Sequence, residues 1–258
     1  MTAATLDTVA TPKVRTDSLG RIFHAARLHA ANPWGTLILP WLIMLAIFGT
    51  SYAIWSLIAM ANGGVENLKP DAFVYNGGGF WALFYMMVVA IQAMNLTFKF
   101  ALGMSLTRHE YYLGSAGYFT MLAALYAAGW TVGAALERAT DGWGLNASFF
   151  IPVFMQDLPL WHLGFMWLTL YLFFMFLGAA VATVYVRWGS NGLVSFFVLL
   201  ALLLIAGVWA IVKFDWGPAI GSWLTGTPVL GIFAWTLVPT AVFGVVGYLL
   251  LRRATPRA

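Results

Sequence analysis

The histidines are the first side chains to consider for chemistry, because imidazole serves as a metal ligand and as a general base near neutral pH. The 258-residue chain has four, at His24, His29, His109 and His162. The first three are expected on one side of a membrane and His162 near the other, so no pair of them could bind a haem within one leaflet. His162 and Asp157 could form a local metal or proton site, but a lone histidine at that depth is more simply hydrated. We therefore expect no metal site and no catalytic residue.

Motifs for other chemistry are missing from the sequence. A nucleotide-binding phosphate loop needs a Gly-Lys pair, and none occurs. The chain has no cysteine, which excludes disulfides and thiolate metal sites. Every carboxylate falls outside the spans placed below, which argues against a relay of proton-binding side chains in a membrane. Nothing here indicates an enzyme.

The strongest local pattern lies in residues 99–114, which read KFALGMSLTRHEYYLG. Thr107 and Glu110 have the spacing of a capping box, so a new helix is predicted to begin at Thr107. Gly103 allows the chain to change direction just before it. A short helix here would project polar side chains into the cytoplasm and hold its two tyrosines at headgroup level, as a docking surface or as a mere turn. The residues concerned are Ser105, Thr107, Arg108, His109, Glu110 and Tyr111.

Six long stretches without Asp, Glu, Lys or Arg must hold the elements that position these residues. They are 28–65, 72–98, 111–136, 158–186, 188–212 and 216–251. A helix needs about 20 apolar residues to cross hydrocarbon about 30 Å thick, so each stretch can hold one span. Only 9% of the residues are charged, against about 25% in a soluble domain. The sequence predicts an all-α integral membrane protein with six transmembrane helices.

The basic residues orient these spans. We place the spans near 36–60, 80–101, 114–136, 158–186, 192–213 and 227–250. Of the 13 Lys and Arg residues, all but Lys69, Arg138 and Lys213 then lie on the side of both termini. The positive-inside rule puts that side in the cytoplasm. This asymmetry explains the net positive charge of the chain, so no nucleic-acid partner needs to be assumed.

The N-terminal region divides into a tail and a helix. Residues 1–18 are predicted to be a disordered cytoplasmic tail, 19–32 an interfacial amphipathic helix, and 33–258 a single six-helix transmembrane domain. In the helix, Phe23 belongs to the apolar face, and Arg21 and Arg27 lie opposite it, toward lipid headgroups. The alternative is an ordinary juxtamembrane segment.

Two further sets of residues could line a pathway. Gln92 and Asn95 share one face of the second span, where they could line a translocation path, the seam between two chains, or only bond other helices within this chain. The outer segment 214–224 is too apolar for a solvated loop and too rich in Gly and Pro for a span. We expect it to be re-entrant or interfacial, with Trp216 and Trp223 at headgroup depth.

Six spans after an amphipathic helix, with ALGMSLTRHEYYLGS after the second span, resemble the permease subunit of type-two ATP-binding-cassette (ABC) exporters. In that family this loop has the character Ser-x-x-Arg-x-Glu-aromatic-x-Leu-Gly, with one extra residue here near Thr107. The resemblance implies that the loop docks a separate ATPase subunit, present in two copies, which binds ATP and Mg, while this chain binds no cofactor. It also implies a second permease chain, identical or related, and re-entrant helices near 214–224.

The expected function is therefore that of a permease subunit in the bacterial plasma (inner) membrane, forming half of an export pathway. Two alternatives stay open: a structural or assembly subunit of a membrane complex without its own pathway, and a membrane-embedded enzyme of lipid metabolism. The sequence does not identify a transported substrate.

Overall fold

The computed structural model describes residues 18–31, 33–75 and 77–253, and no strand occurs among them. Five helices in this part of the chain are long and apolar enough to cross a membrane. They cover Trp34–Ala61, Trp81–Gly103, Arg108–Ala139, Leu160–Lys213 and Val229–Arg252. The prediction of an all-helical chain with membrane-spanning potential is confirmed at this level. The predicted tail lies outside the described residues, except for Ser18, which begins the first helix.

The longest connections between the α-helices are residues 62–80, between α2 and α3, and 140–159, between α5 and α6. The α-helices are α1 (Ser18–Ala30), α2 (Leu39–Ala61), α3 (Trp81–Gln92), α4 (Phe98–Gly103), α5 (Arg108–Ala139), α6 (Leu160–Lys213), α7 (Gly217–Gly226), α8 (Val229–Trp235) and α9 (Leu237–Arg252). The shorter elements are the π-helices η1 (Trp34–Ile38), η3 (Ala93–Thr97) and η4 (Gly142–Asn146) and the 3₁₀-helices η2 (Val65–Asn67) and η5 (Val153–Met155).

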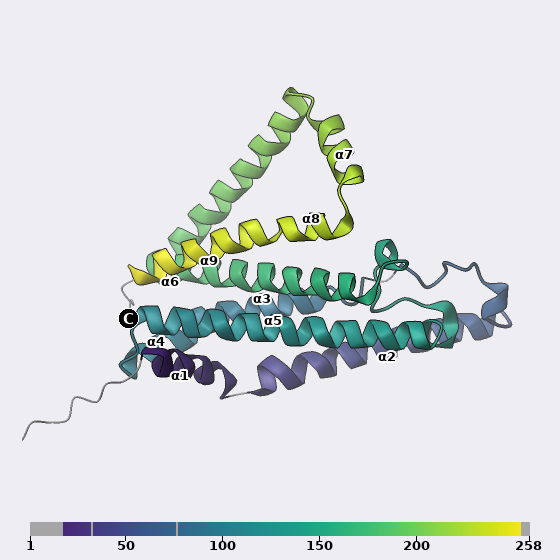
Figure 1. Cartoon of the computed structure of the whole chain (residues 1–258), viewed down its shortest axis with the longest axis horizontal. Coiled ribbons are helices and arrows are strands. Elements are labelled where there is room, and N and C mark those ends of the chain that lie inside the picture. The colour runs from purple at the N-terminus through teal and green to yellow at the C-terminus, as the bar shows by residue number, and fades with distance from the viewer. Residues whose placement is uncertain (1–17, 32, 76, 254–258) are drawn as a thin grey trace, which may run out of the picture.

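Helix α6 holds what the sequence predicts as two spans. Its 54 residues are interrupted at Gly189, whose φ of 71° and ψ of −159° are not helical. Such angles are essentially restricted to glycine, so this residue allows the chain to reverse direction. We call residues 160–188 the inner half and residues 190–213 the outlying half of α6. The inner half packs against α3, α5 and α9, whereas the ribbon of the outlying half leaves the bundle (Figure 1).

The last apolar helix is also divided. Helices α8 and α9 meet at Thr236, which is a turn residue. Pro239 follows in the first turn of α9. A proline within a helix removes one backbone hydrogen bond and crowds the preceding turn, which accounts for the break.

Helix α1 packs differently from the sequence-based expectation. Arg21, Ala25 and His29, spaced one turn apart, contact α5 at Glu110, Gly114 and Ser115 in the same order, so α1 lies alongside α5. Its contact face is therefore this stripe, and Arg21 points to α5 rather than to lipid headgroups. A Cβ on Gly114 would lie 2.7 Å from the Ala25 Cβ, which is why this approach requires glycine. Phe23, at 70% exposure, stays on the outer side.

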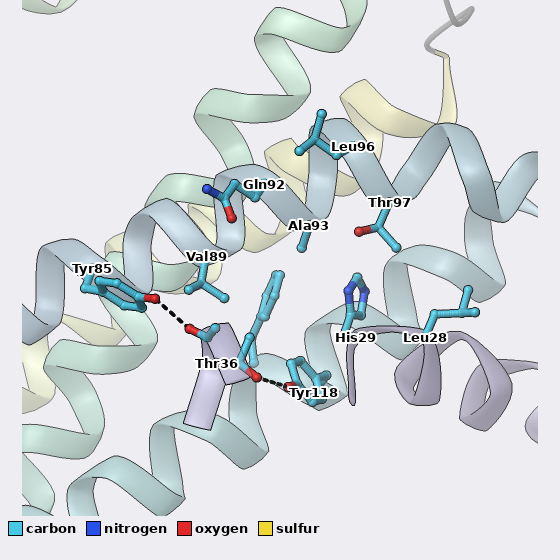
Figure 2. Close-up of a pocket in the computed structure, with 12 residues that line it drawn as sticks. Leu28, His29, Thr36, Tyr85, Val89, Gln92, Ala93, Leu96, Thr97 and Tyr118 are labelled. Atoms are coloured by element: carbon cyan, nitrogen blue, oxygen red, sulfur yellow. Dashed lines mark hydrogen bonds between the residues drawn. The ribbon is translucent and has the colours of Figure 1, made fainter. Parts of the chain in front are cut away.

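Tyrosine hydroxyl groups bond the segment between α1 and α2, which includes η1. The Tyr85 hydroxyl donates to the carbonyl oxygen of Gly35 at 2.7 Å, and the Tyr118 hydroxyl donates to Oγ1 of Thr36 at 3.1 Å (Figure 2). Tyr126 donates to the carbonyl oxygen of Thr36 at 2.8 Å. Three tyrosines from α3 and α5 therefore bond the first turn of the segment that leads into α2.

The segment after α5 folds back onto the bundle. Glu137 is only 2% exposed and accepts hydrogen bonds from the backbone N–H groups of Phe149, Phe150 and Ile151 and from Nε1 of Trp143. Phe149 and Phe150 pack against the Trp130 ring, at 6.1 and 5.1 Å between centroids. One buried carboxylate thus organises this connection.

Candidate functional site

The turn between α4 and α5 is formed by backbone geometry at Ser105. Ser105 has a φ of 61°, in the left-handed region, whereas Gly103 does not have a positive φ. The sequence therefore indicates the correct place for the change of direction but the wrong residue. The reversal is held by a hydrogen bond from the Leu106 N–H to the Ala101 carbonyl oxygen, at 3.2 Å.

Thr107 begins α5, as predicted, through a complete capping box. Its Oγ1 accepts from the Glu110 N–H at 3.2 Å, and Oε2 of Glu110 accepts from the Thr107 N–H at 2.9 Å. These bonds satisfy N–H groups that have no partner inside the helix. The helix differs from the expected short one, because α5 runs without interruption for 32 residues. The turn therefore leads directly into α5, which is long enough to run the length of the bundle.

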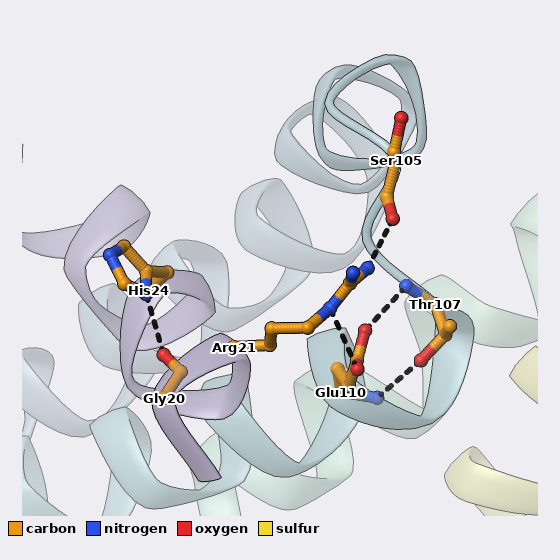
Figure 3. Close-up of polar contacts among 6 residues, drawn as sticks. All are labelled: Gly20, Arg21, His24, Ser105, Thr107 and Glu110. Carbon is orange, nitrogen blue, oxygen red and sulfur yellow. Dashed lines mark hydrogen bonds and ion pairs between the residues drawn. The ribbon is translucent and has the colours of Figure 1, made fainter. Parts of the chain in front are cut away.

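Glu110 also connects this turn to α1. Oε1 of Glu110 lies 2.8 Å from Nε of Arg21, and the Arg21 guanidinium donates to the carbonyl oxygen of Ser105 (Figure 3). The two side chains are 29% and 10% exposed, so the pair is largely shielded from solvent. Removing one partner of a shielded pair leaves an uncompensated charge, which makes the contact costly to break. Arg21 thus binds both sides of the turn at once.

The start of α5 is also bonded to the end of α9. Nη1 of Arg108 donates to the carbonyl oxygen of Arg252 at 3.0 Å. Nδ1 of His109 lies 3.1 Å from the hydroxyl of Tyr248. A cation beside the last carbonyl groups of a helix is favourable, because those groups carry partial negative charge. We name these residues together the turn cluster: Arg21, Ser105, Thr107, Arg108, His109 and Glu110.

The turn cluster divides into exposed and buried members. Ser105, Thr107 and His109 are exposed, and Arg108 is half-buried. Glu110 is 8% exposed, and Tyr111 is fully buried with its hydroxyl donating to the carbonyl oxygen of Ala93 at 2.6 Å. Glu110 therefore does not project outward as expected, and both tyrosines are buried within the chain. Their side chains are used within the chain, because the capping box and the Arg21 contact draw Glu110 inward.

Of the other sequence-predicted residues, Arg27 lies near the turn cluster, where it lines a pocket together with Arg21. Gln92, exposed, is the last residue of α3, and Asn95, half-buried, lies in η3. The wider π turn of η3 changes the spacing assumed for a regular helix. Arg27 is exposed on α1. Trp216 precedes α7 and contacts Phe214 at 5.5 Å between ring centroids, and Trp223 contacts Trp235 at 6.4 Å. Both indoles are exposed, and their depth in a membrane remains a prediction.

Sequence reasoning did not identify the buried role of His29. Its Nε2 lies 2.8 Å from Oγ of Ser115, and its ring lies between Tyr111 and Tyr118 at 5.5 and 5.4 Å between centroids. Burial lowers the pKa of His29 to about 4, so the ring is neutral at pH 7. The four-residue spacing of Arg21, Ala25 and His29 is the signal that could have indicated this contact face.

The arrangement links separate helices through hydrogen bonds and an ion pair. In the described ranges, no group of three or more His, Cys, Asp or Glu residues could hold a metal ion. The turn cluster instead joins α1, α5 and α9 at one end of the bundle. Comparisons with protein-family models, with curated proteins and with solved structures found no match.

Proposed function

We propose that this chain is the permease subunit of an ATP-driven exporter in a bacterial plasma membrane. The proposal gives it six spans, counting the two halves of α6 separately, with both termini in the cytoplasm. It is a transport subunit rather than an enzyme, and ATP and Mg bind to a separate ATPase. Two ATPase copies and a second permease chain, identical or related, complete the transporter, with the lipid bilayer around it.

The observation that carries the proposal is the turn cluster. It joins the exposed turn to three helices through the Arg21–Glu110 pair and the Arg108 bond to α9. Met104 is 54% exposed beside Ser105 and offers an apolar contact at the same turn. A partner that pushes on this turn would move α5 as a rigid element. This is the mechanical requirement for coupling ATP hydrolysis to a membrane pathway.

One alternative has its own support. The outlying half of α6 presents a long apolar surface, including Leu202, Leu203 and Ile205, each about 60% exposed or more. A structural subunit could use this surface to assemble with other membrane proteins without forming a pathway. The alternative does not require an ATPase at the turn.

The experiment uses substitutions that spare the internal contacts of the turn cluster. Glu110→Lys is unsuitable alone, because it would disrupt the contact with Arg21 as well as any partner contact. We choose Met104→Glu, at an exposed position. The tagged chain is purified from its native membranes, and co-purifying ATP hydrolysis is measured. We expect about a tenfold loss for Met104→Glu, which corresponds to roughly 1.4 kcal/mol.

Met60→Glu is the matched control, because Met60 is 76% exposed at the last turn of α2, away from the turn cluster. It should retain the wild-type level of co-purifying ATPase. If the wild-type chain brings down no ATP-hydrolysing partner, or if Met104→Glu retains a fully coupled one, the permease proposal fails and the structural-subunit alternative replaces it.

A further inference from the structure

A cavity of about 260 Å³ lies beside the interruption between α1 and α2 (Figure 2). Residues from α1, η1, α3, η3 and α5 contribute to its wall, so five separate elements meet around it. The lining is mixed. Its apolar part includes Leu28, Val89 and Leu96, and its polar part includes His29, Thr36 and Gln92.

The hydrogen bonds of His29 determine what its ring can offer. The Ser115 hydroxyl donates its single proton to the carbonyl oxygen of Tyr111, at 2.8 Å. Its oxygen must therefore accept from Nε2–H of His29, at 2.8 Å. The neutral ring then has an unprotonated Nδ1, whose lone pair can accept a hydrogen bond. His29 can offer a hydrogen-bond acceptor to a ligand.

Thr36 and Gln92 offer the complementary groups. Oγ1 of Thr36 accepts from the Tyr118 hydroxyl, so its own proton remains available as a donor. The exposed Gln92 amide can both donate and accept. The cavity therefore matches a group that both donates and accepts hydrogen bonds, which is the property of a hydroxyl.

The lining also excludes charged ligands. None of the described residues that form this wall is Asp, Glu, Lys or Arg. An ion in such surroundings would lose its hydration without gaining a counter-charge, which is strongly unfavourable. The ligand should therefore be neutral.

Size and position point to the headgroup of a lipid. The volume is below the range of about 300–1,000 Å³ that holds whole drug-sized ligands. Leu96, at the wall, is 67% exposed, so apolar chains could continue outward along it. Tyr118 lies four residues after Gly114, where the predicted third span begins, or about 6 Å along the axis of α5. This depth is compatible with a headgroup held just inside one leaflet.

We propose that this cavity binds the uncharged, hydroxyl-bearing headgroup of a membrane lipid, with diacylglycerol as the simplest example. Its hydroxyl donates to His29 and accepts from Thr36 or Gln92, and its acyl chains lie outside beside Leu96. The inference does not depend on the proposed export function.

The test is photo-crosslinking of the full-length chain in phosphatidylcholine nanodiscs. The probe is a diacylglycerol with a diazirine near the glycerol backbone, and labelled peptides are mapped by mass spectrometry. We expect labelling within residues 28–36 and 85–97. Unlabelled diacylglycerol and a neutral glycosyl diacylglycerol should both compete. Phosphatidic acid with the same chains should compete at least tenfold less well.

Val89→Trp fills the cavity and should reduce labelling at least tenfold. Its control is Val88→Trp, because the neighbouring Val88 is exposed and does not line the cavity. Should Val89→Trp fail to fold, Gln92→Leu, at an exposed position, should weaken probe binding roughly two- to tenfold by removing one hydrogen bond. The proposal is overturned if Val89→Trp is labelled as strongly as the wild type, or if Gln92→Leu binds the probe as tightly as the wild type. It is also overturned if phosphatidic acid competes as well as diacylglycerol.

Discussion

The two halves of α6 are equally free of charge along their apolar stretches, yet only the inner half is packed. The inner half has buried residues along its whole length, and all the buried residues of α6 precede Gly189. The outlying half has none. Hydrophobicity therefore does not distinguish them. Within a membrane, lipid chains are as apolar as leucine, so helix association depends on close packing instead.

Small residues allow the closest approaches of the packed half. The buried face of the inner half contains Gly178, Ala179, Ala180, Ala182 and Thr183. The outlying half is rich in exposed Leu, Val and Ile side chains. Small side chains allow helix backbones to approach, and bulky ones keep them apart. Both halves contain small residues, but Gly178 faces the backbone of α3 whereas Gly207 faces no neighbour. The comparison teaches that hydropathy does not indicate which apolar helix packs, and that a small residue matters only where it faces another helix.

The largest expected effect comes from a bulky residue at the packed interface. A Cβ on Gly178 would lie 2.5 Å from the carbonyl oxygen of Met87. Backbone cannot move aside easily, so Gly178→Leu should lower the free energy of unfolding by at least about 3 kcal/mol or prevent folding. Thermal unfolding in detergent micelles measures this.

Gly207→Leu in the outlying half is the matched variant. No atom lies within 4 Å of a Cβ built there. Because leucine favours helix more than glycine does, its stability should stay within about 1 kcal/mol of wild type. Equal losses at the two positions would contradict the proposed role of small residues.

The junction between the halves should give a smaller effect. Gly189→Ala places a side chain at φ 71° and ψ −159°, which costs about 1–3 kcal/mol unless the backbone rearranges. The outlying half should therefore change its angle to the inner half. Because the chain has no cysteine, spin labels at Trp161→Cys and Ile205→Cys report this distance. The control Gly207→Ala should leave the distance distribution unchanged. An unchanged distribution in Gly189→Ala as well would mean that the conformation of Gly189 does not determine the angle between the two halves.

The bundle should also show a pH dependence at α1. Burial lowers the pKa of His29 to about 4 from the ordinary 6.5. Below pH 6.5 the unfolded chain binds a proton that the folded chain resists, so stability is fully present above pH 6.5 and falls toward pH 4. The slope approaches about 1.4 kcal/mol per pH unit. Denaturant titrations across this range test it. His29→Gln should flatten the curve, and an equally steep curve in that variant would assign the effect to another group.

The smallest effect is expected at an exposed indole. Trp216→Tyr keeps an aromatic ring with a polar end, so stability should change by less than about 0.5 kcal/mol. Trp130→Tyr in the bundle should cost at least about 2 kcal/mol, because Trp130 is buried and donates from Nε1 to the Tyr171 hydroxyl. Comparable losses in both variants would indicate that the region around Trp216 is packed as tightly as the bundle.

Much of the local structure follows from the sequence alone. The charge-free stretches predicted the apolar helices, because charge is costly in hydrocarbon. Thr107 and Glu110 predicted a helix start, because a capping box depends on groups only three residues apart. Such features rest on local spacing, which is why no tertiary information was needed.

The tertiary structure decided the partners. Glu110 meets Arg21 and Arg108 meets Arg252 across long sequence separations, and no spacing rule specifies such pairs. His29 is buried because α1 packs along α5, and Glu137 because the following segment folds back around it. Which apolar half of α6 enters the bundle likewise depends on whether its surface matches a neighbouring helix, and that match exists only once the helices are packed together.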